Sequence, residues 1–382
     1  MAWNSSPACD FLTDDLISEI LVRVPVKPLL RLKLVSKPWR SLITSPRFIK
    51  SQFDHAITKA GADQTLIVYK REDLSMTPLN LHSLQVGPRL GVPYSRGDFS
   101  FTPYSKLVAS HDGVVCVRVS NFPRQQFNSS NFCKLHNPDI YIWNPATRQS
   151  KLLPPHTIRH KIKSVSVGFG FDPVGKEFKV VRIVASFDKP FCAEVYSVNR
   201  NAWRKVEPRP YDLPYYDEFD VCVKGLLCCT GMYGLMAFDL SREVFTSGIK
   251  IPVRCRSLRV YNARLTVVKD SIAVAFFSKR AELSGKVKLW TLDDDACLRG
   301  GEVEASWTLL LSVQVDLPVR FVRGYFNSGD ILLVVAGEDT ETWCLYNTDK
   351  KEAKAVPSSI YASQVIKYNE SLVSVEGSKQ VT

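Results

Sequence analysis

Residues 12–50 read LTDDLISEILVRVPVKPLLRLKLVSKPWRSLITSPRFIK, and this stretch predicts three short helices. Thr13 is a candidate N-cap, because two acidic residues follow it and apolar residues then recur at helical spacing up to Val24. Pro25 ends this first helix, since a proline ring blocks continuation and lacks an N–H. A helical module therefore opens the chain.

The second and third predicted helices follow at once. Pro28 fits the first position of the second helix, Ser36 is a candidate cap for the third, and Pro38 can enter its first turn. The second helix is apolar nearly all round, so two partners must share it. About forty residues are too few to bury so much apolar surface, so the module must dock on the rest of the chain or on a partner. The helical pattern alone fits equally well the N-terminal helical corner of an ordinary enzyme, which is the alternative to a docking module.

The order of residues resembles an F-box of the plant type, with the pattern EIL-R-PVK-LLR-K-VSK-WRSLI. The matching residues are 19–21, 23, 25–27, 29–31, 33, 35–37 and 39–43. The family usually has Leu-Pro where this chain has Leu12-Thr13, and the lost proline is expected to weaken helix pre-organisation slightly. The resemblance implies binding to the Skp-family adaptor, and through it to the cullin, of a Skp–Cullin–F-box ubiquitin ligase.

Carried over by position, the resemblance implies a set of residues that face the adaptor. Residues 11–50 hold eight Lys/Arg against three Asp/Glu, and the adaptor family is acidic, so charge would favour the rate of encounter. The adaptor-facing candidates are Leu12, Thr13, Leu16, Ile20, Pro25, Leu29, Val35, Ser36 and Trp39.

A repeated unit fills the rest of the chain: an alternating strand ends in an aromatic residue, and a polar turn leads into a second strand. The aromatic residues are 74, 53, 42, 52 and 56 residues apart. A repeat near fifty residues built from short strands is typical of a β-propeller, here of about six blades; an open array of β-sandwiches is the alternative. The six aromatic residues are Tyr69, Trp143, Tyr196, Phe238, Trp290 and Tyr346.

Strongly apolar segments alternate with these units and are expected to be inner strands, buried between neighbouring sheets. They cover residues 112–117, 167–172, 224–229, 270–275 and 329–335. A propeller must join its two ends, because open sheet edges are a liability. Residues 363–375 are therefore predicted to complete the blade that residues 65–70 begin.

The propeller region also resembles a known family. WNPAT (143–147), GFGFD (168–172), FKVVR (178–182) and VYS with a following Trp (195–203) are similar to the plant F-box-associated domain, a kelch-like propeller used for substrate capture; Phe178 stands where the family usually has Tyr. The expected fold is a small all-α N-terminal F-box of three helices followed by an all-β kelch-like β-propeller of about six blades. The expected boundaries are a disordered N-terminus (1–9), the F-box (10–53), a linker (54–64), the propeller (65–376) and a disordered tail (377–382).

Composition narrows the class of protein. The sequence has no apolar run of eighteen residues and no secretory signal at its N-terminus. Its ten cysteines are scattered through apolar strand-like segments, which indicates small buried hydrophobic residues in a cytoplasmic or nuclear protein. The net charge of +12 leaves nucleic-acid binding as a minor alternative, and an acidic substrate surface is the better candidate.

Catalytic and metal motifs are weak. The sequence contains no Gly-rich phosphate loop, no G-x-S-x-G and no H-E-x-x-H, so we expect no catalytic residues and no cofactor. Cys133-x2-His136 and His156-x3-His160 have spacings compatible with zinc, but a predicted strand separates the two pairs, so polar loop residues are the favoured interpretation and no metal is expected.

Two loops are candidates for substrate binding. Residues 120–139 form a polar insertion with aromatic residues, and residues 211–220 (YDLPYYDEFD) are acidic and rich in Tyr. The predicted function is the substrate-recognition subunit of the ligase, a non-catalytic role, with an unidentified protein as target. The alternative is a propeller enzyme or sugar-binding protein with a helical cap. The substrate-contact candidates are Phe122, Phe127, Phe132, Tyr215 and Tyr216.

Overall fold

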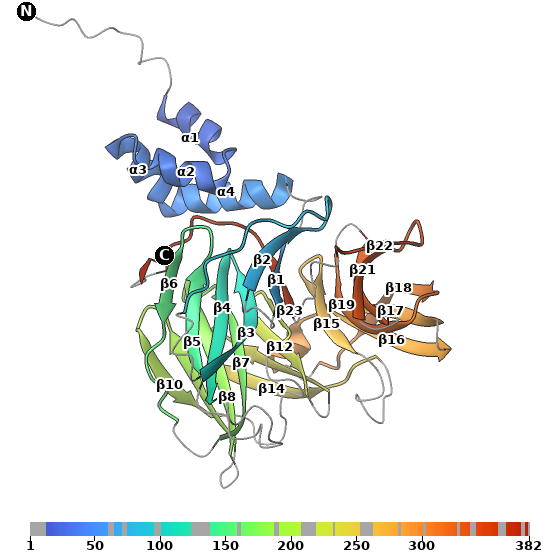
Figure 1. Cartoon of the computed structure of the whole chain (residues 1–382). Coiled ribbons are helices and arrows are strands. Elements are labelled where there is room, and N and C mark those ends of the chain that lie inside the picture. The colour runs from blue at the N-terminus through green and yellow to red at the C-terminus, as the bar shows by residue number, and fades with distance from the viewer. Residues whose placement is uncertain are drawn as a thin grey trace, which may run out of the picture.

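The computed structural model describes residues 13–59, 65–70, 75–94, 101–123, 138–158, 162–186, 191–207, 219–231, 234–252, 263–281, 284–300, 303–326, 329–336, 341–357, 364–375 and 379–380. Helices come first in the chain and strands follow (Figure 1). The helices are α1 (Asp14–Val22), α2 (Val26–Leu32), α3 (Lys37–Thr44) and α4 (Pro46–Lys59).

Side-chain caps define the starts of two helices. The Oγ1 atom of Thr13 accepts a hydrogen bond from the backbone N–H of Leu16 at 3.4 Å, and the Oγ atom of Ser36 accepts one from the N–H of Trp39 at 3.3 Å. Both predicted N-caps are therefore confirmed. The second helix begins at Val26, so Pro28 is its third residue rather than its first, still in the first turn where a missing N–H is tolerated.

A fourth helix, α4, follows the three predicted ones. A linker was expected over residues 54–64, but α4 continues to Lys59. Phe48 and Gln52 of this helix are buried, and the Gln52 amide donates a hydrogen bond to the carbonyl of Val24 at 3.4 Å. Helix α4 therefore packs against the segment that ends α1, a tertiary contact that local propensity alone does not predict.

The strands of the described residues form six antiparallel sheets, numbered here as blades 1 to 6. Blade 1 contains β1 (Thr65–Lys70), β2 (Ser75–Asn80) and β23 (Gln364–Tyr368); blade 2 contains β3 (Phe101–His111), β4 (Val114–Pro123), β5 (Asp139–Asn144), β6 (Gln149–Leu152) and β24 (Lys379–Gln380). Blade 3 contains β7 (Ile162–Asp172), β8 (Glu177–Ser186), β9 (Cys192–Ser197) and β10 (Ala202–Val206); blade 4 contains β11 (Val221–Val223), β12 (Leu226–Thr230), β13 (Leu235–Asp239) and β14 (Val244–Ile249). Blade 5 contains β15 (Arg264–Val268), β16 (Ser271–Ala281), β17 (Ser284–Leu292) and β18 (Trp307–Val315), with the short 3-10 helix η2 (Ala296–Arg299) before β18; blade 6 contains β19 (Val319–Tyr325), β20 (Asp330–Ala336), β21 (Glu341–Asn347) and β22 (Glu352–Ala355).

The blades follow one another around a ring. Strand β23 contacts β3, β3 contacts β7, β7 contacts β11, β11 contacts β15 and β15 contacts β19. These are the strands at one end of each blade, so they form the inner wall of the propeller. The predicted six-bladed propeller is confirmed.

The ring is closed by the end of the chain. Strand β23 pairs with β1 in antiparallel register, with Val68 opposite Val365 and Ile67 opposite Ile366. The prediction that residues 363–375 complete the first blade is therefore confirmed for residues 364–368, whereas residues 369–375 form no strand. Strand β24 pairs with β6 of blade 2, so residues 379–380 are ordered against a sheet edge where a disordered tail was expected.

Each aromatic residue of the predicted repeat lies on β1, β5, β9, β13, β17 or β21. This is the next-to-outermost strand in five blades, and in blade 2 the short strand β24 adds a further strand outside β6. In four blades, the polar residue after the aromatic one accepts a backbone hydrogen bond within the turn that follows. The fifth residue after the aromatic one has a left-handed φ in the same four blades, which completes the turn. The capping residues are Asn144, Ser197, Asp239 and Asn347, and the left-handed residues are Arg148, Asn201, Glu243 and Lys351.

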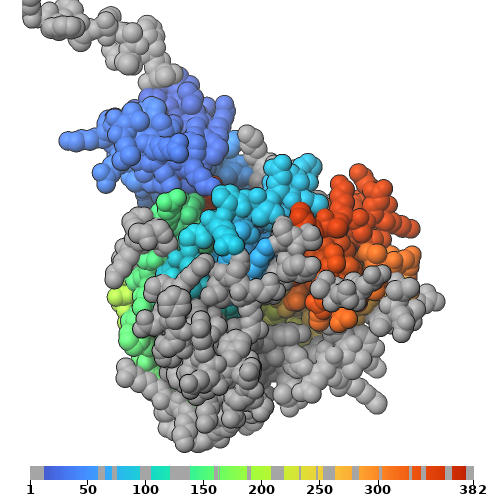
Figure 2. Space-filling view, viewed as in Figure 1, coloured from blue at the N-terminus to red at the C-terminus, as the bar shows by residue number. Residues whose placement is uncertain are grey.

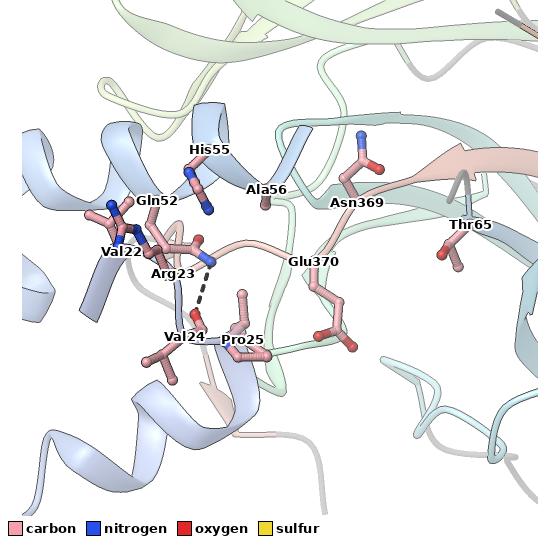
Figure 3. Close-up of a pocket in the computed structure, with 11 residues that line it drawn as sticks. Val22, Arg23, Val24, Pro25, Gln52, His55, Ala56, Thr65, Asn369 and Glu370 are labelled. Atoms are coloured by element: carbon pink, nitrogen blue, oxygen red, sulfur yellow. Dashed lines mark hydrogen bonds between the residues drawn. The ribbon is translucent and has the colours of Figure 1, made fainter. Parts of the chain in front are cut away.

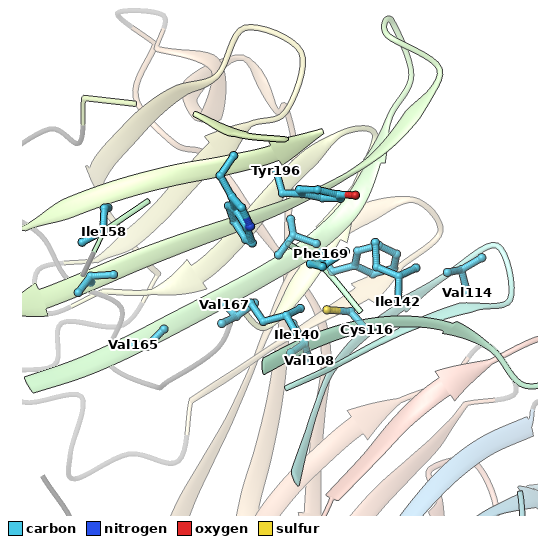
Figure 4. Close-up of a cluster of buried hydrophobic side chains, with 14 of the residues drawn as sticks. Val108, Val114, Cys116, Ile140, Ile142, Ile158, Val165, Val167, Phe169 and Tyr196 are labelled. Atoms are coloured by element: carbon cyan, nitrogen blue, oxygen red, sulfur yellow. The ribbon is translucent and has the colours of Figure 1, made fainter. Parts of the chain in front are cut away.

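The core lies between neighbouring blades. Ile142 of β5 and Val167 of β7 belong to one buried cluster that joins blades 2 and 3, together with Phe169 and Tyr196 (Figure 4). Strand β12 is buried at every residue, as predicted for an inner strand. Because each blade buries both faces against its neighbours, the ring forms a rigid support for the helices.

Candidate functional site

The helical module carries exposed apolar side chains. Leu34 is 86% exposed and Val35 is 65% exposed, both in the turn between α2 and α3; Ile20 and Leu16, one turn apart on α1, are 52% and 47% exposed. The N-terminal end of α1 points away from the propeller (Figure 1). Large exposed apolar residues grouped on one small module are typical of a protein-binding surface.

The remaining predicted adaptor-facing residues have mixed positions. Thr13 and Pro25 are exposed, and Ser36 and Trp39 are half-buried. Thr13 and Ser36 already use their hydroxyl groups to cap α1 and α3. Leu12 lies outside the described residues.

Leu29 is a core residue, and its prediction as an adaptor contact is wrong. Its side chain is 0% exposed and packs in a cluster with Leu21, Val26 and Ile43. The all-apolar second helix has one side facing the other helices, and the spacing of its leucines could not show which side that is.

The same buried cluster includes two residues of the propeller. Ala146, in the turn between β5 and β6, and Leu372, close to the C-terminus, pack with the apolar residues of the helical module. Figure 2 shows the module as a lobe seated on one side of the propeller. The helices are therefore joined to the propeller through a shared core, and the chain itself covers part of their apolar surface.

Residues 369–375, called here the C-terminal strap, follow β23 and run beneath α4 towards β6 (Figure 1). The Oγ atom of Ser371, which is fully buried, donates a hydrogen bond to the carbonyl of Asp112 at 2.5 Å. Gln149 of β6 accepts hydrogen bonds at 3.2 Å from the hydroxyl of Ser374 and the N–H of Val375. The strap is thus fixed to blade 2 along its length and presents Leu372 to the helices.

Asn144 connects the strap to the propeller turn. Its amide nitrogen donates to the carbonyls of Ser371 and Val373 at 3.1 and 2.7 Å. Its Oδ1 atom accepts from the N–H groups of Ala146 and Thr147 at 3.0 and 3.3 Å. The WNPAT motif pointed to this turn in sequence, but its contacts with residues more than 200 positions later left no local signal.

A cavity of about 280 Å³ lies between the module and the propeller, with Val24, Gln52, Asn369 and Glu370 in its wall (Figure 3). Lys27 forms an ion pair with Glu370 beside it, with Nζ and Oε1 3.3 Å apart and both side chains well exposed. The cavity is part of the contact between the two domains.

Four of the five predicted substrate-contact residues lie outside the part of the chain that the structure describes. Phe122 lies near the end of β4, and nothing is described of its side chain; Phe127, Phe132, Tyr215 and Tyr216 lie outside the described residues. Their assignment stays a prediction.

Blade 3 contains a buried ionic cluster. The Arg182 guanidinium contacts Glu194 Oε1 at 2.5 Å, and both side chains are fully buried. Glu194 Oε2 also accepts from the hydroxyl and N–H of Thr157, at 2.6 and 3.1 Å. His156, 3.8 Å from Glu194, lies 2.8 Å from the carbonyl of Pro138 through its Nε2 atom, and burial lowers its pKa. These contacts join β8 and β9 to the loop before β7.

No group of three or more His, Cys, Asp or Glu residues suited to a metal ion occurs within the described ranges. Of the four candidate zinc ligands considered from the sequence, three lie outside those ranges: Cys133, His136 and His160. Within the same ranges, no helix has the length and apolar content needed to cross a membrane.

Comparisons with known proteins agree with this architecture. The F-box domain family matches residues 10–51, and the F-box associated beta propeller domain family matches residues 94–372. An F-box/LRR-repeat protein of Arabidopsis thaliana is 27% identical over 324 residues, covering 79% of this chain and 67% of that protein. F-box protein CPR1 of Arabidopsis thaliana is 30% identical over 207 residues, covering 50% of this chain and 44% of that protein.

Among solved structures, TolB from Acinetobacter baumannii covers 85% of this chain and 73% of its own, with 8% identity and a TM-score of 0.44, a likeness too low to support any argument. The family matches span most of the chain and coincide with the helical module and the propeller. This chain therefore belongs to the F-box proteins that carry an F-box associated β-propeller domain.

Proposed function

We propose that this chain is the substrate-recognition subunit of a Skp–Cullin–F-box ubiquitin ligase. The helical module docks a Skp-family adaptor, and through it a cullin, while the propeller binds a target protein for ubiquitination. The chain makes and breaks no covalent bonds itself. It holds the lysines of the target near the conjugating enzyme that carries ubiquitin, so that proximity accelerates the transfer of ubiquitin.

One observation supports the adaptor role most directly: the F-box buries Leu29 and its neighbours against the propeller, yet leaves Leu34, Val35, Ile20 and Leu16 exposed. A module held by its own propeller has no internal use for this second apolar surface. An adaptor that covers it would remove apolar area from water, which is the main driving force of most protein association. The shared core through Leu372 supports a fixed spacing between adaptor and target.

We also propose a cytoplasmic or nuclear location. The described cysteines form no disulfide, and Cys228 and Cys229 are both buried in β12 as small apolar residues. This usage suits a compartment in which thiols stay reduced.

A binding experiment with a purified Skp-family adaptor tests the proposal. The wild-type chain should bind, and the double variant Leu34→Asp, Val35→Asp should bind at least about tenfold more weakly, because each exposed apolar contact is replaced by a charge. Val174→Asp is the matched control: Val174 is equally exposed but lies in a propeller turn. Failure of the wild type to bind, or equal binding by the double variant and the control, would contradict the adaptor role.

The target is best sought by affinity purification with the proteasome blocked. A protein that accumulates on the wild-type chain, and is ubiquitinated only when the adaptor-binding surface is intact, meets both parts of the proposal. A partner whose ubiquitination is unaffected by Leu34→Asp, Val35→Asp would argue for a binding protein outside the ligase.

A further inference from the structure

The cavity of about 280 Å³ between the helical module and the propeller has walls from segments far apart in the chain (Figure 3). Residues 22–26 end α1 and lead into α2, Gln52 and Ala56 belong to α4, Thr65 begins β1, and residues 369–370 belong to the C-terminal strap. A molecule bound in this cavity would therefore contact the F-box and the propeller at the same time.

Gln52 is a buried polar residue in this wall, and only one end of its side-chain amide has a partner. The residue is 3% exposed, and its Nε2 atom donates to the Val24 carbonyl at 3.4 Å, which is long for an N–H···O bond. Its Oε1 atom is buried and accepts no hydrogen bond from the residues that the structure describes. A buried acceptor without a donor costs free energy, and a donor that enters from the cavity would recover it. Because this one long bond holds the amide loosely, a small rotation presents Oε1 to such a donor.

The electrostatic surroundings of the cavity also favour a hydrogen-bond donor. Helix α1 ends at Val22, so the cavity lies at its carbonyl end, where the last turn carries partial negative charge. Pro25, in the same wall, has no N–H to offer to those carbonyls. The wall also contains Arg23 and Glu370, which carry opposite charges, and Glu370 pairs with Lys27 at 3.3 Å. An uncharged ligand with a donor group therefore suits the cavity better than a cation or an anion.

Apolar side chains form the larger part of the wall. Residues 22 and 24–26 contribute three valines and a proline, and Ala56 contributes a methyl group from α4. Mostly apolar walls with a few polar groups that fix orientation are typical of small-molecule sites. The cavity volume is close to the lower end of the range for such sites, so it suits a ligand about the size of a single substituted ring.

We propose that this cavity binds a small uncharged molecule with an apolar body and an N–H or O–H group that donates to Gln52 Oε1. Such a ligand would stabilise the junction of the F-box with the propeller, because a molecule that binds only the folded arrangement shifts the equilibrium towards it. The site adds a small-molecule ligand to the two protein partners of the proposed ligase role. Pro25 is both a wall residue and a predicted adaptor contact, so adaptor binding must be measured alongside.

Fluorine NMR of para-fluorobenzamide with the full chain tests the site. The matched probe is N,N-dimethyl-para-fluorobenzamide, which lacks the N–H donor and should bind about fivefold more weakly, the loss expected for one hydrogen bond. The cation para-fluorobenzylamine and the anion para-fluorobenzoate should also bind more weakly than para-fluorobenzamide. Ala56→Leu fills the cavity and should weaken the binding of both amides about tenfold, because packed space excludes the ring. Thr58→Leu is the matched control, since Thr58 is exposed on the same helix and lies outside the wall.

The role of Gln52 is tested by Gln52→Met, which keeps the length of the side chain and removes the acceptor. The two amides should then bind alike; a purely structural role of Gln52 would lower the melting temperature without removing the preference for the N–H donor. The proposal is overturned if para-fluorobenzamide does not bind, if a charged probe binds more tightly, if the wild type binds both amides alike, or if Ala56→Leu binds as well as Thr58→Leu. Thermal melting reports the folding of each variant, and the wild-type preference together with Ala56→Leu decides the matter if Gln52→Met does not fold. Adaptor binding by the same variants distinguishes failure of this site from failure of the ligase role.

Discussion

Leu372 of the C-terminal strap lies in the same buried cluster as Leu29 of the second F-box helix. The F-box and the propeller therefore share one core, although Leu29 and Leu372 lie near opposite ends of the chain. Packed interiors resist deformation, so this contact sets the orientation of the exposed F-box surface relative to the propeller.

Leu372→Ala should loosen the F-box from the propeller. Truncating a buried leucine removes apolar contacts and leaves a cavity, which costs about 2–5 kcal/mol. We expect a lower free energy of unfolding in urea and faster hydrogen exchange in α1, α2 and α3. Leu310→Ala is the control, because Leu310 is half exposed on β18. Equal effects from the two substitutions would show that the shared core does not hold the F-box.

The ion pair between Lys27 and Glu370 should matter much less. Both side chains are well exposed, and surface pairs of this kind contribute about 0–1 kcal/mol. A double-mutant cycle with Lys27→Gln and Glu370→Gln should give a coupling energy below about 1 kcal/mol, decreasing further in high salt. A larger, salt-resistant coupling would contradict this ranking of the two contacts.

Asn144→Ala should destabilise the strap as well as a propeller turn. The substitution removes the donor to the Ser371 and Val373 carbonyls and leaves those buried groups without this partner, at about 1–3 kcal/mol beyond the loss of the turn. Asn347→Ala is the matched comparison, because Asn347 caps the equivalent turn of blade 6, accepting from the Lys350 N–H at 2.9 Å. Urea unfolding should show the larger loss for Asn144→Ala, with faster exchange in the helices for that variant alone.

His156 should make stability depend on pH. Burial lowers its pKa below the ordinary value of 6.5, and Arg182 lowers it further, against opposing effects of the Pro138 carbonyl and Glu194. The unfolded chain therefore takes up a proton first as pH falls, so this contribution to stability is complete above about pH 6.5 and is lost below it. Urea unfolding at about pH 7.5 and about pH 5.5 should show a smaller decrease for His156→Gln than for the wild type. An identical decrease would mean that His156 titrates alike in both states.

The sequence was informative wherever a pattern was local. The aromatic repeat located one strand in each of the six blades, because strand alternation and turn chemistry are set by neighbouring residues. Thr13 and Ser36 were identified as N-caps for the same reason. The closure of β23 on β1 followed from a general need to satisfy sheet edges.

The sequence was less informative wherever distant segments meet. Leu29 belongs to a helix that is apolar on every side, so its burial depends on where the other helices and Leu372 pack. Ser371 and Leu372 lie in residues 363–375, which were predicted to belong wholly to the first blade, and no local pattern there indicates contact with the helices.

The pairing of β23 with β1 also constrains the order of events during synthesis. Val365 is made roughly 300 residues after its partner Val68, so at about 5–20 residues per second the first blade waits about 15–60 s for its missing strand. The strap that supports the F-box emerges later still. A chain that stops before residue 364 would thus carry an F-box without the strap that supports it, and residues 364–375 must be synthesised before the first blade and the F-box contact can both form.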